Sequence, residues 1–433
     1  MTRTLGAKIL ALALGASLVA ACTSTSNDDP AEPTGPVELT FWSWAPNMEK
    51  LVDRWNADNP ETTVTLSKQA GGADIVAKLL TAAKAGNPPD LAQVEYQALP
   101  TLVSNDVLAD IAEQAKPLAE KFAEGTWRQV TLGTDAVYAI PQDAAPMMLY
   151  YRTDLFQQFG LTVPKTWEEF AHTARTLRGR STKHFLTTFS ANDPGWFAGL
   201  AQQAGANWWG IDGESWRVTV DDAATRKVAD YWGGLVGEGV VDGNPMYTPE
   251  WNKALNDGTL LAWPSAVWAP GVLVGNAPDT RGRWAMAPLP QWSAGENRTG
   301  NWGGSSTGVT SASKHRTAAV RFATWLNTHP DATSMLVREC AVYPAARDAQ
   351  SGPGLASPPD FFAGQADFYP LARQIAETAA GVTWGPNVNV TYETYQDAFG
   401  KAITEKTPFG AAVDAMQTAT VDDMRKNGFT IAG

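Results

Sequence analysis

Tryptophan and acidic side chains are the residues of this sequence that are best suited to chemistry. The chain has 18 Trp against 15 Phe and 10 Tyr. A Trp side chain has a large apolar face and an N–H group that needs a partner when buried, so a Trp-rich chain indicates binding surfaces. Aromatic and polar residues recur together at Trp44 and Asn47, at Glu95 and Tyr96, and near Asp143. This combination favours noncovalent binding of a ligand.

Other kinds of chemistry have less support in the sequence. Two Cys and four His leave almost nothing for a metal site, so we expect neither a metal nor a cofactor. The formal charge is -12, from 33 Lys and Arg against 45 Asp and Glu, which disfavours binding to nucleic acid or to an anionic membrane. The paired carboxylates of a glycosidase are a spatial arrangement, so a secreted glycosidase stays open as an alternative.

The elements that must position these side chains alternate between strand and helix. Strand-forming runs lie at residues 37–42, 63–66 and 90–94, and apolar residues at helical spacing lie between them, at 48–55 and 75–83. Such alternation predicts an α/β fold with a mostly parallel sheet. In such sheets the loops at the carboxyl ends of the strands form the binding crevice, which is where the clusters above fall.

Three helix boundaries can be predicted from local signals. Thr166 stands three residues before Glu169, which is the spacing of a capping box at the start of a helix. Asp222 precedes a second helix, and the pair His329-Pro330 ends a third.

The first 36 residues have the organisation of an export signal and a tether. An apolar run over residues 9–19 is too short to span a bilayer comfortably and fits a secretory signal peptide. The run ends in Val-Ala-Ala before Cys22, which resembles a bacterial lipobox; an ordinary signal peptide that contains a Cys is the alternative. We therefore expect a signal peptide over residues 1–21, a lipidated Cys22 and a flexible polar tether within residues 22–36.

Short motifs spread over the rest of the chain carry a resemblance to a known family. In chain order they are Thr-Phe-Trp-Ser-Trp at 40–44, Asn-Pro-Pro-Asp-Leu at 87–91, Tyr-Ala-Ile-Pro-Gln-Asp at 138–143, Met-Leu-Tyr-Tyr-Arg-Thr-Asp-Leu-Phe at 148–156, Val-Pro-Lys-Thr-Trp-Glu-Glu-Phe at 163–170, Gly-Thr-Leu-Leu-Ala-Trp-Pro-Ser at 258–265 and Asn-Trp-Gly-Gly-Ser at 301–305. Together they resemble family 1 of the extracellular solute-binding proteins of bacterial ABC importers. Arg152 departs from the usual Asn after the second Tyr, which affects the signature rather than the pocket.

The resemblance implies a two-lobed α/β fold of the periplasmic-binding-protein type II, like that of maltose-binding protein, with the ligand cleft between the lobes. It also implies three crossings of the chain between the lobes, which we place near residues 143–147, 302–307 and 384–388. These crossings give the expected domains, which are residues 37–143 plus 306–384 for lobe 1 and residues 144–305 plus 385–433 for lobe 2.

The resemblance and the crevice rule together give a set of candidate ligand-binding residues. The set is Trp44, Asn47, Glu95, Tyr96, Asp143, Trp196, Trp268, Trp302, Arg347, Trp384, Asn387 and Tyr392. Trp268 stands where the family often presents a stacking aromatic side chain. Alternative roles stay open: Glu95 and Tyr96 as a solvated rim, Trp196 as the start of a packed helix, and Arg347 as a surface residue.

Such a cleft suits a sugar, because indole faces cover the C–H side of a sugar ring while carboxylates and amides accept its hydroxyl groups. The resemblance implies a carbohydrate ligand, expected to be a di- or oligosaccharide, that is handed without chemical change to the permease subunits of an ABC importer. We expect a monomer at the extracytoplasmic face of the bacterial cell membrane. The alternatives are binding proteins of the same fold for a polyamine, a glycerophosphodiester or a peptide; an acidic, Trp-rich cleft suits a polyamine.

Overall fold

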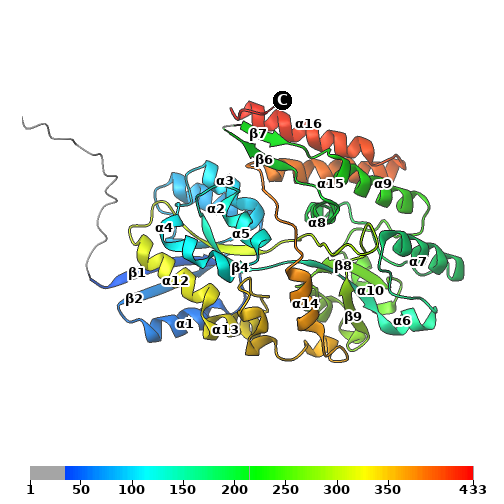
Figure 1. Cartoon of the computed structure of the whole chain (residues 1–433), viewed down its shortest axis with the longest axis horizontal. Helices are drawn as coiled ribbons and strands as arrows, with labels where there is room; N and C mark the ends of the chain where they lie inside the picture. Colours follow the sequence, from blue (N-terminus) through cyan, green and yellow to red (C-terminus); the bar gives the residue numbers. More distant parts are fainter. Residues whose placement is uncertain (1–34, 214, 433) are drawn as a thin grey trace, which may run out of the picture.

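The structure, a computed structural model, describes residues 35–213 and 215–432. These residues form two lobes that lie side by side (Figure 1). The expected signal peptide over residues 1–21, the lipidation of Cys22 and nearly all of the tether lie outside the described residues. Across the described part of the chain, every helix is either too short or too polar to cross a bilayer.

Lobe 1 is built on a five-stranded sheet whose strand order is β2–β1–β3–β10–β4. The strands are β1 (Val37–Ser43), β2 (Thr62–Lys68), β3 (Leu91–Glu95), β4 (Ala139–Asp143) and β10 (Ser305–Val309). β1 pairs in parallel with β2 and β3, whereas β10 pairs antiparallel with β3 and β4. In this register Ser305 lies opposite Glu95 on one side and opposite Asp143 on the other. The sheet therefore brings two of the candidate carboxyl groups to one edge of the lobe.

Helices cover both faces of this sheet. They are α1 (Met48–Asp58), α2 (Ala73–Lys84), α3 (Leu99–Ser104), α4 (Ala112–Ala115), α5 (Glu124–Thr131), α12 (Arg316–Thr328) and α13 (Pro330–Cys340). The apolar stripe predicted for α1 is confirmed, since Met48, Leu51, Val52 and Trp55 are all buried. The Trp55 ring meets the Phe322 ring of α12 edge-on, with the centroids 5.3 Å apart. α12 ends where His329-Pro330 predicted it to end.

Lobe 2 holds a three-stranded sheet of order β8–β5–β9 and a separate hairpin. The strands are β5 (Met147–Arg152), β8 (Ala262–Ala266), β9 (Trp284–Pro288) and, in the hairpin, β6 (Trp209–Asp212) and β7 (Ser215–Val218). All of these pairs are antiparallel, so the expectation of a mostly parallel sheet is wrong for this lobe. The alternation of apolar residues along a strand tells which side is buried and carries no information about the direction of the neighbouring strand.

Lobe 2 is rich in helices. They are α6 (Thr153–Gln158), α7 (Trp167–Arg180), α8 (Pro194–Ala204), α9 (Ala223–Gly237), α10 (Pro249–Asp257), α11 (Ala269–Asn276), α14 (Phe368–Ala376), α15 (Val388–Glu405) and α16 (Gly410–Lys426). Short 3-10 turns occur in both lobes, at Tyr96–Ala98, Lys116–Lys121, Pro278–Thr280, Ala349–Ser351, Pro353–Leu355 and Asp360–Phe362. The predicted cap of α7 is confirmed, because the Thr166 hydroxyl accepts a hydrogen bond from the Glu169 amide at 3.1 Å.

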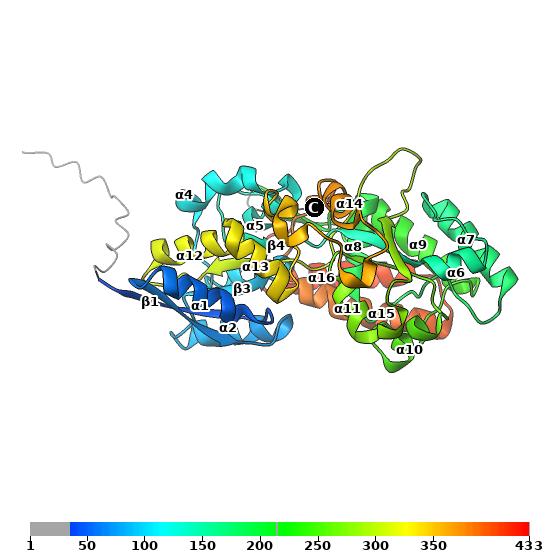
Figure 2. The same ribbon diagram turned by 90° about the horizontal axis from the view of Figure 1, so that it is seen from below.

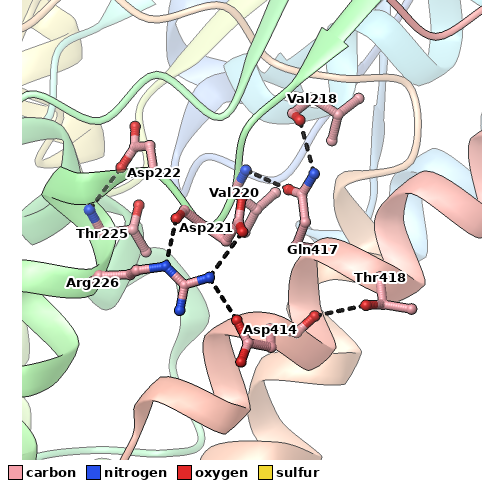
Figure 3. A network of polar contacts seen from close by, with 9 residues as sticks. All are labelled: Val218, Val220, Asp221, Asp222, Thr225, Arg226, Asp414, Gln417 and Thr418. Carbon is pink, nitrogen blue, oxygen red and sulfur yellow. Dashed lines mark hydrogen bonds and ion pairs between the residues drawn. The ribbon is translucent and has the colours of Figure 1, made fainter. Parts of the chain in front are cut away.

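A polar network ties the outer helices of lobe 2 together (Figure 3). Asp222 caps α9 as predicted, its carboxylate accepting from the Thr225 amide at 2.7 Å. The Arg226 guanidinium of α9 bonds to the Asp221 carboxylate, just before this helix, at 2.9 Å. It also bonds to the Asp414 carboxylate of α16 at 2.6 Å. These contacts join α9 to α16, and α16 packs along α15, so the layer seen at the top of lobe 2 in Figure 1 forms one unit.

Two of the expected crossings between the lobes run together. β4 continues into β5 through residues 144–146, and Pro146 forms a β-bridge with Asn301 of the returning chain. The Met147 amide donates to the Gly300 carbonyl at 2.9 Å, and the Trp302 amide donates to the Ala145 carbonyl at 3.0 Å. These two segments form a double-stranded hinge behind the cleft.

The third crossing differs from the expectation. Up to Arg347 the chain is bonded to lobe 1, but the Phe362 ring packs against Tyr150 of β5, and the Gln365 side chain bonds both backbone groups of Met286 in β9. The chain thus contacts lobe 2 from about Phe361 onward, earlier than expected, and it touches lobe 1 again where Trp384 donates to Gln129 of α5. Figures 1 and 2 both place α14 between the lobes. Contacts with distant segments decide this boundary, and such contacts leave no local pattern in the sequence.

Candidate functional site

A pocket of about 220 Å³ opens between the lobes in front of the hinge. Lobe 1, lobe 2 and the hinge all contribute to its wall, which is formed by Gln97, Asn192, Asp193, Pro194, Gly195, Asn301, Trp302, Gly303, Trp384 and Tyr392. Of these described lining residues, none is Lys or Arg. A pocket with walls from two bodies changes its shape when the bodies move, which is how hinged proteins enclose a ligand.

Three carboxyl groups lie close together at this pocket, of which Asp193 lines it and Glu95 and Asp143 stand behind its wall. Glu95 stands at the end of β3 and Asp143 at the end of β4, while Asp193 precedes α8 on lobe 2 and caps that helix by accepting from the Trp196 amide at 3.0 Å. The Asp143 carboxylate accepts hydrogen bonds from the Ser305 amide, at 2.7 Å, and from the Ser305 hydroxyl. Gln97 donates its side-chain amide to the Glu95 carboxylate at 2.7 Å.

The electrostatic state of these acids follows from their surroundings. Burial raises the pKa of Glu95 from its ordinary value near 4.5 to about 7, and the charges of Asp143 and Asp193 add to the shift. Burial likewise raises the pKa of Asp143 to about 6 and that of Asp193 to about 6, although hydrogen bonds from neighbouring groups oppose both shifts. Near neutral pH the Glu95 carboxyl group is therefore present in both forms, and it can accept or donate a hydrogen bond to a ligand.

Aromatic rings form much of the pocket wall. The Trp302 and Trp268 rings meet edge to face with centroids 4.6 Å apart, and the Trp268 indole N–H donates to the Trp302 carbonyl at 2.8 Å. Gly195 makes room for the Trp302 ring, because a Cβ atom at this position would lie only 3.0 Å from it. The rings of Trp384 and Tyr392, which also line the pocket, are nearly perpendicular, with centroids 6.4 Å apart.

The structure brings several of the predicted site residues together. Trp302, Trp384 and Tyr392 line the pocket, and the charges of Glu95 and Asp193 both act on the Tyr392 hydroxyl, which places Glu95 beside the pocket as well. Asp143 interacts with Glu95 across Ser305. Two further predicted residues, Trp268 and Tyr96, do not line the pocket but contact residues around it. Trp268 supports Trp302.

Tyr96 is the other of these two supporting residues. Its ring is buried, and its hydroxyl donates to the Asp143 carbonyl at 2.9 Å. A Cβ atom on Gly304 would lie 2.8 Å from the Tyr96 ring, so the hinge passes directly over this side chain. Tyr96 therefore positions Asp143 and the hinge, and it does not form the solvated rim that the sequence left open.

Two other predicted residues are engaged elsewhere. Trp196 is fully buried in lobe 2, where its indole N–H donates to the Pro264 carbonyl, so the alternative of a packed helix start is correct. Asn387 is buried against α16, and its side chain donates to Thr420 and Asp423. Both side chains donate hydrogen bonds inside lobe 2, and neither is among the lining residues of the pocket.

The remaining predicted residues lie on lobe 1 or near the lobe boundary. The Asn47 side chain donates to the Glu339 carbonyl and ties α1 to α13. The Arg347 guanidinium pairs with Glu377 at 3.2 Å in an exposed position, so its surface alternative is correct. Trp44 is half-buried and packs against Gly71. These three residues do not line the described pocket.

Sequence reasoning missed Asp193 and Gln97 as site residues. An Asp before a Pro is a recognisable start of a helix, and Asp193-Pro194 has this form. That signal predicts the cap of α8, but only the packing of α8 against the hinge turns the cap toward the cleft. Gln97 lies in the turn after β3 and has no sequence signal of its own.

A sequence pattern typical of hydrolases occurs at the start of β10, where it has a structural role. Residues 304–308 read Gly-Ser-Ser-Thr-Gly, which fits the nucleophile pattern G-x-S-x-G. Ser306 lies within β10, is buried, and donates its hydroxyl to the Val94 carbonyl at 3.0 Å. A nucleophile elbow needs a sharp turn between strand and helix, so this serine does not form one. In the described part of the chain, no three His, Cys, Asp or Glu side chains are grouped to hold a metal ion.

Comparison with known proteins identifies a matching family and several relatives. The sequence model of the family described as bacterial extracellular solute-binding protein matches residues 42–333, which is more than half of the chain. A lactose-binding protein of Rhizobium radiobacter is 26% identical over 402 residues, which cover 89% of this chain and 92% of that protein.

Two solved structures are similar over nearly the whole chain. The galacto-N-biose-/lacto-N-biose I-binding protein of an ABC transporter from Bifidobacterium longum, solved with lacto-N-biose, has a TM-score of 0.81 and 26% identity and covers 93% of this chain and 100% of its own. An ABC-transporter-associated binding protein from B. animalis subsp. lactis Bl-04, solved with beta-1,6-galactobiose, has a TM-score of 0.76 and 25% identity and covers 92% of this chain and 100% of its own.

Proposed function

This chain belongs to the family of bacterial extracellular solute-binding proteins, and on that premise we propose that it captures a di- or oligosaccharide for an ABC importer. The relatives named above bind lactose, lacto-N-biose or beta-1,6-galactobiose according to their descriptions. The observation that carries the proposal is the composition of the pocket, whose wall combines aromatic rings, amide side chains and Asp193, with the Glu95 carboxyl group close by.

In the proposed complex the aromatic rings and the acids have different tasks. Trp302 covers the apolar face of a sugar ring, and Trp384 and Tyr392 add further aromatic surface to the pocket. Glu95, Asp143 and Asp193 accept hydrogen bonds from sugar hydroxyls, and hydrogen bonds to a charged acceptor are roughly twice as strong as those between neutral groups. Because these groups belong to two lobes, the sugar makes its full set of contacts only in the closed state.

Closure then follows from differential binding. A ligand shifts the balance between open and closed states only by the difference between its affinities for the two. The double-stranded hinge at residues 144–146 and 301–304 allows the lobes to move while it keeps them in register. The permease subunits of the importer recognise the closed form, and the ligand is handed over without chemical change.

Calorimetry tests the proposed ligand class. The panel consists of lactose, maltose, lacto-N-biose, beta-1,6-galactobiose, their constituent monosaccharides, spermidine and glycerol 3-phosphate. We expect at least one disaccharide to bind in the micromolar range or tighter, which corresponds to about -8 kcal/mol. In Asp193→Asn and Glu95→Gln the affinity should fall, whereas Asp279→Asn, on an outlying 3-10 turn of lobe 2, serves as a control that should bind normally. Binding of no saccharide would contradict the proposal.

A polyamine is the second candidate, and one observation favours it. Asp193 lines the pocket, Glu95 and Asp143 lie near it, and the described lining residues include no Lys or Arg, so a ligand with positive charges would offset the charge of these acids. The same lining disfavours a phosphate ester, because an anion would meet the acids without a basic partner. Tight binding of spermidine in the panel, with no saccharide bound, would replace a sugar by a polyamine as the ligand.

We also propose that Cys22 anchors the protein to the extracytoplasmic face of the membrane through a lipid. The support is the lipobox-like run before Cys22 and the family's extracellular role. Cys22→Ala should abolish labelling by a radioactive fatty acid and release the protein from the membrane fraction or leave the signal peptide uncleaved. Ser24→Ala is the matched control and should leave labelling and partition unchanged. A Cys22→Ala variant with the mass and membrane partition of the wild type would contradict the anchor.

A further inference from the structure

The third crossing of the chain between the lobes is in contact with both of them. Figure 1 shows it as the extended orange segment between α14 and the layer of α15 and α16. Its first residues, 379–381, lie at the pivot, where the Ala380 amide donates to the Thr299 carbonyl beside the hinge at 2.8 Å. The residues that follow, 382–386, run past the pocket and are held from two sides.

On the side of lobe 2, the crossing is held by its backbone and by close packing. The Thr383 amide donates to the Asn207 side chain at 3.1 Å, and Thr383 forms a β-bridge with Trp209 of β6. A Cβ atom on Gly385 would lie 2.1 Å from the Trp209 indole nitrogen. The cavity left between α8, β6 and residues 382–384 measures only about 10 Å³. This segment of the crossing therefore moves together with lobe 2.

On the side of lobe 1, two side chains reach the same segment. The Trp384 indole N–H donates to the Gln129 side chain of α5 at 3.1 Å. The Thr101 hydroxyl of α3 donates to the Pro386 carbonyl at 2.8 Å. Gln129 is 2% exposed and Trp384 is 6% exposed, so water has almost no access to the bond between them.

These two bonds join lobe 1 to a segment that is fixed on lobe 2. When the lobes separate at the pocket, Gln129 and Thr101 leave with lobe 1 while Trp384 and Pro386 stay with lobe 2, so both bonds break. In the closed arrangement, in which both lobes contact the crossing as they do here, the Trp384 N–H is buried and depends on Gln129 as its acceptor. A buried donor without a partner is unfavourable, so loss of the Gln129 side chain destabilises the closed arrangement more than the open one.

We propose that Gln129 is a positioning residue that latches the two lobes through Trp384, so that part of the ligand-free protein is already closed and every ligand gains affinity by a common factor. Thr101 supports the same latch through Pro386. A ligand that binds one conformation has an apparent affinity scaled by the fraction of the protein in that conformation, whatever the ligand is. The effect on affinity rests on the proposed binding function, whereas the effect on the shape of the ligand-free protein does not.

Small-angle scattering of the ligand-free protein tests the latch directly. Gln129→Leu and Thr101→Val each remove one of the two bonds with little change in side-chain size, and each should increase the radius of gyration. Thr131→Val is the matched control, because the Thr131 hydroxyl donates to the Arg128 carbonyl at 3.1 Å within α5, and its radius should equal that of the wild type. An unchanged radius in Gln129→Leu overturns the proposal even if this variant unfolds at a lower temperature. If Gln129→Leu does not fold, Thr101→Val decides in the same way.

The combined variant shows whether Gln129 acts through Trp384. Trp384→Phe keeps a ring but lacks the N–H, so the bond to Gln129 is already absent. Adding Gln129→Leu to Trp384→Phe should therefore leave the radius of gyration unchanged. A further increase of the radius would show that Gln129 acts on the lobes by another route and would overturn the latch.

Calorimetry with the panel described above separates a latch from a ligand contact. In Gln129→Leu the affinity should fall about fivefold for every saccharide that binds the wild type, with the same factor for each. Factors that differ strongly between saccharides would mean that the variant changes the pocket itself, and they would overturn the latch. A wild-type protein that binds no member of the panel contradicts the proposed function instead, and the scattering of the ligand-free variants then decides the latch on its own.

Discussion

At the scale of single residues, the site is defined by Glu95 and the two aspartates near it. Each is an acid that the protein surrounds with few compensating charges, and burial makes the neutral form more favourable than it is in water. The consequence is that the ligand-free protein binds protons in a pH range where an unfolded chain has already lost them.

This property gives a prediction about stability and pH. The pKa of Glu95 is about 7 in the folded protein and near 4.5 when unperturbed, so between these values the folded state holds more protons than the unfolded state. Stability therefore falls as the pH rises from about 4.5 to about 7, and Asp143 and Asp193 act in the same direction up to about 6. Urea unfolding midpoints of the ligand-free protein, measured across this range, should show the fall.

The variant Glu95→Gln isolates the largest contributor. It cannot ionise, so its stability should depend less on pH than that of the wild type, most clearly between pH 6 and 7 where the aspartates contribute little. Glu377→Gln changes an exposed acid near the lobe boundary and is the control. Parallel curves for Glu95→Gln and the wild type would show that Glu95 does not titrate as the structure indicates.

Residue identity and position were predictable to different extents. Glu95 and Asp143 follow strands that can be recognised by their apolar runs, and the crevice rule places them at the site. The prediction that Trp196 binds the ligand failed. Its position after an Asn-Asp-Pro-Gly turn fits either a binding platform or a packed helix start, and only its full burial decides between these two roles. Asp193 was missed because the orientation of α8 depends on tertiary packing.

At the scale of elements, α8 of lobe 2 packs closely against the hinge. Gly199 and Gly300 meet so closely that a Cβ atom on Gly300 would lie 1.8 Å from the Gly199 carbonyl oxygen. A Cβ atom on Gly199 would lie 2.3 Å from the Met147 sulfur and 2.8 Å from the Asn301 carbonyl oxygen. This contact sets the distance between α8, which Asp193 caps, and the hinge segment, which contains Trp302.

Gly199→Ala should therefore damage both stability and binding. Met147 can move its side chain, but the Asn301 carbonyl is backbone, so the helix has to shift, at a cost of about 1–3 kcal/mol in unfolding free energy. The shift moves Asp193 away from Trp302, and disaccharide affinity should fall as well. Gly234→Ala in α9 is the control; nothing lies within 4 Å of its Cβ position, so this change should stabilise by about 0.5–1 kcal/mol. Normal binding and stability of Gly199→Ala would show that the contact is not restrictive.

Local signals were sufficient for elements whose boundaries are set locally. The stripe of α1 and the caps of α7 and α9 depend on residues within one or two turns, and all three predictions are confirmed. The strand directions in lobe 2 and the third crossing depend on pairings such as Met148 with Ser265 and Gln365 with Met286, which join segments far apart in the chain. A single sequence contains no record of these pairings.

At the scale of the whole molecule, function depends on two lobes that are each stable and a hinge that lets them move. Trp55 illustrates the stability of a lobe: it is 2% exposed, its indole N–H donates to the Thr62 carbonyl at 2.8 Å, and it packs on α12. Trp268 differs, because it is only half-buried and supports Trp302 at the cleft. The two residues therefore separate the stability of a lobe from the closure of the molecule.

Trp268→Ala should leave lobe 2 folded but impair capture of the ligand. Without the indole, Trp302 loses an edge-to-face partner and a donor to its carbonyl, so the closed state gains less from the ligand, and affinity should fall by about 2 kcal/mol, roughly thirtyfold. Small-angle scattering should then show that a disaccharide concentration sufficient to compact the wild type leaves the variant extended, since the ligand shifts the equilibrium only by its differential affinity. In contrast, Trp55→Ala should lower the unfolding free energy by about 3–5 kcal/mol and still close on the ligand while it remains folded. A Trp268→Ala protein that binds and compacts normally but unfolds early would place Trp268 in the core of lobe 2 and remove it from the binding site.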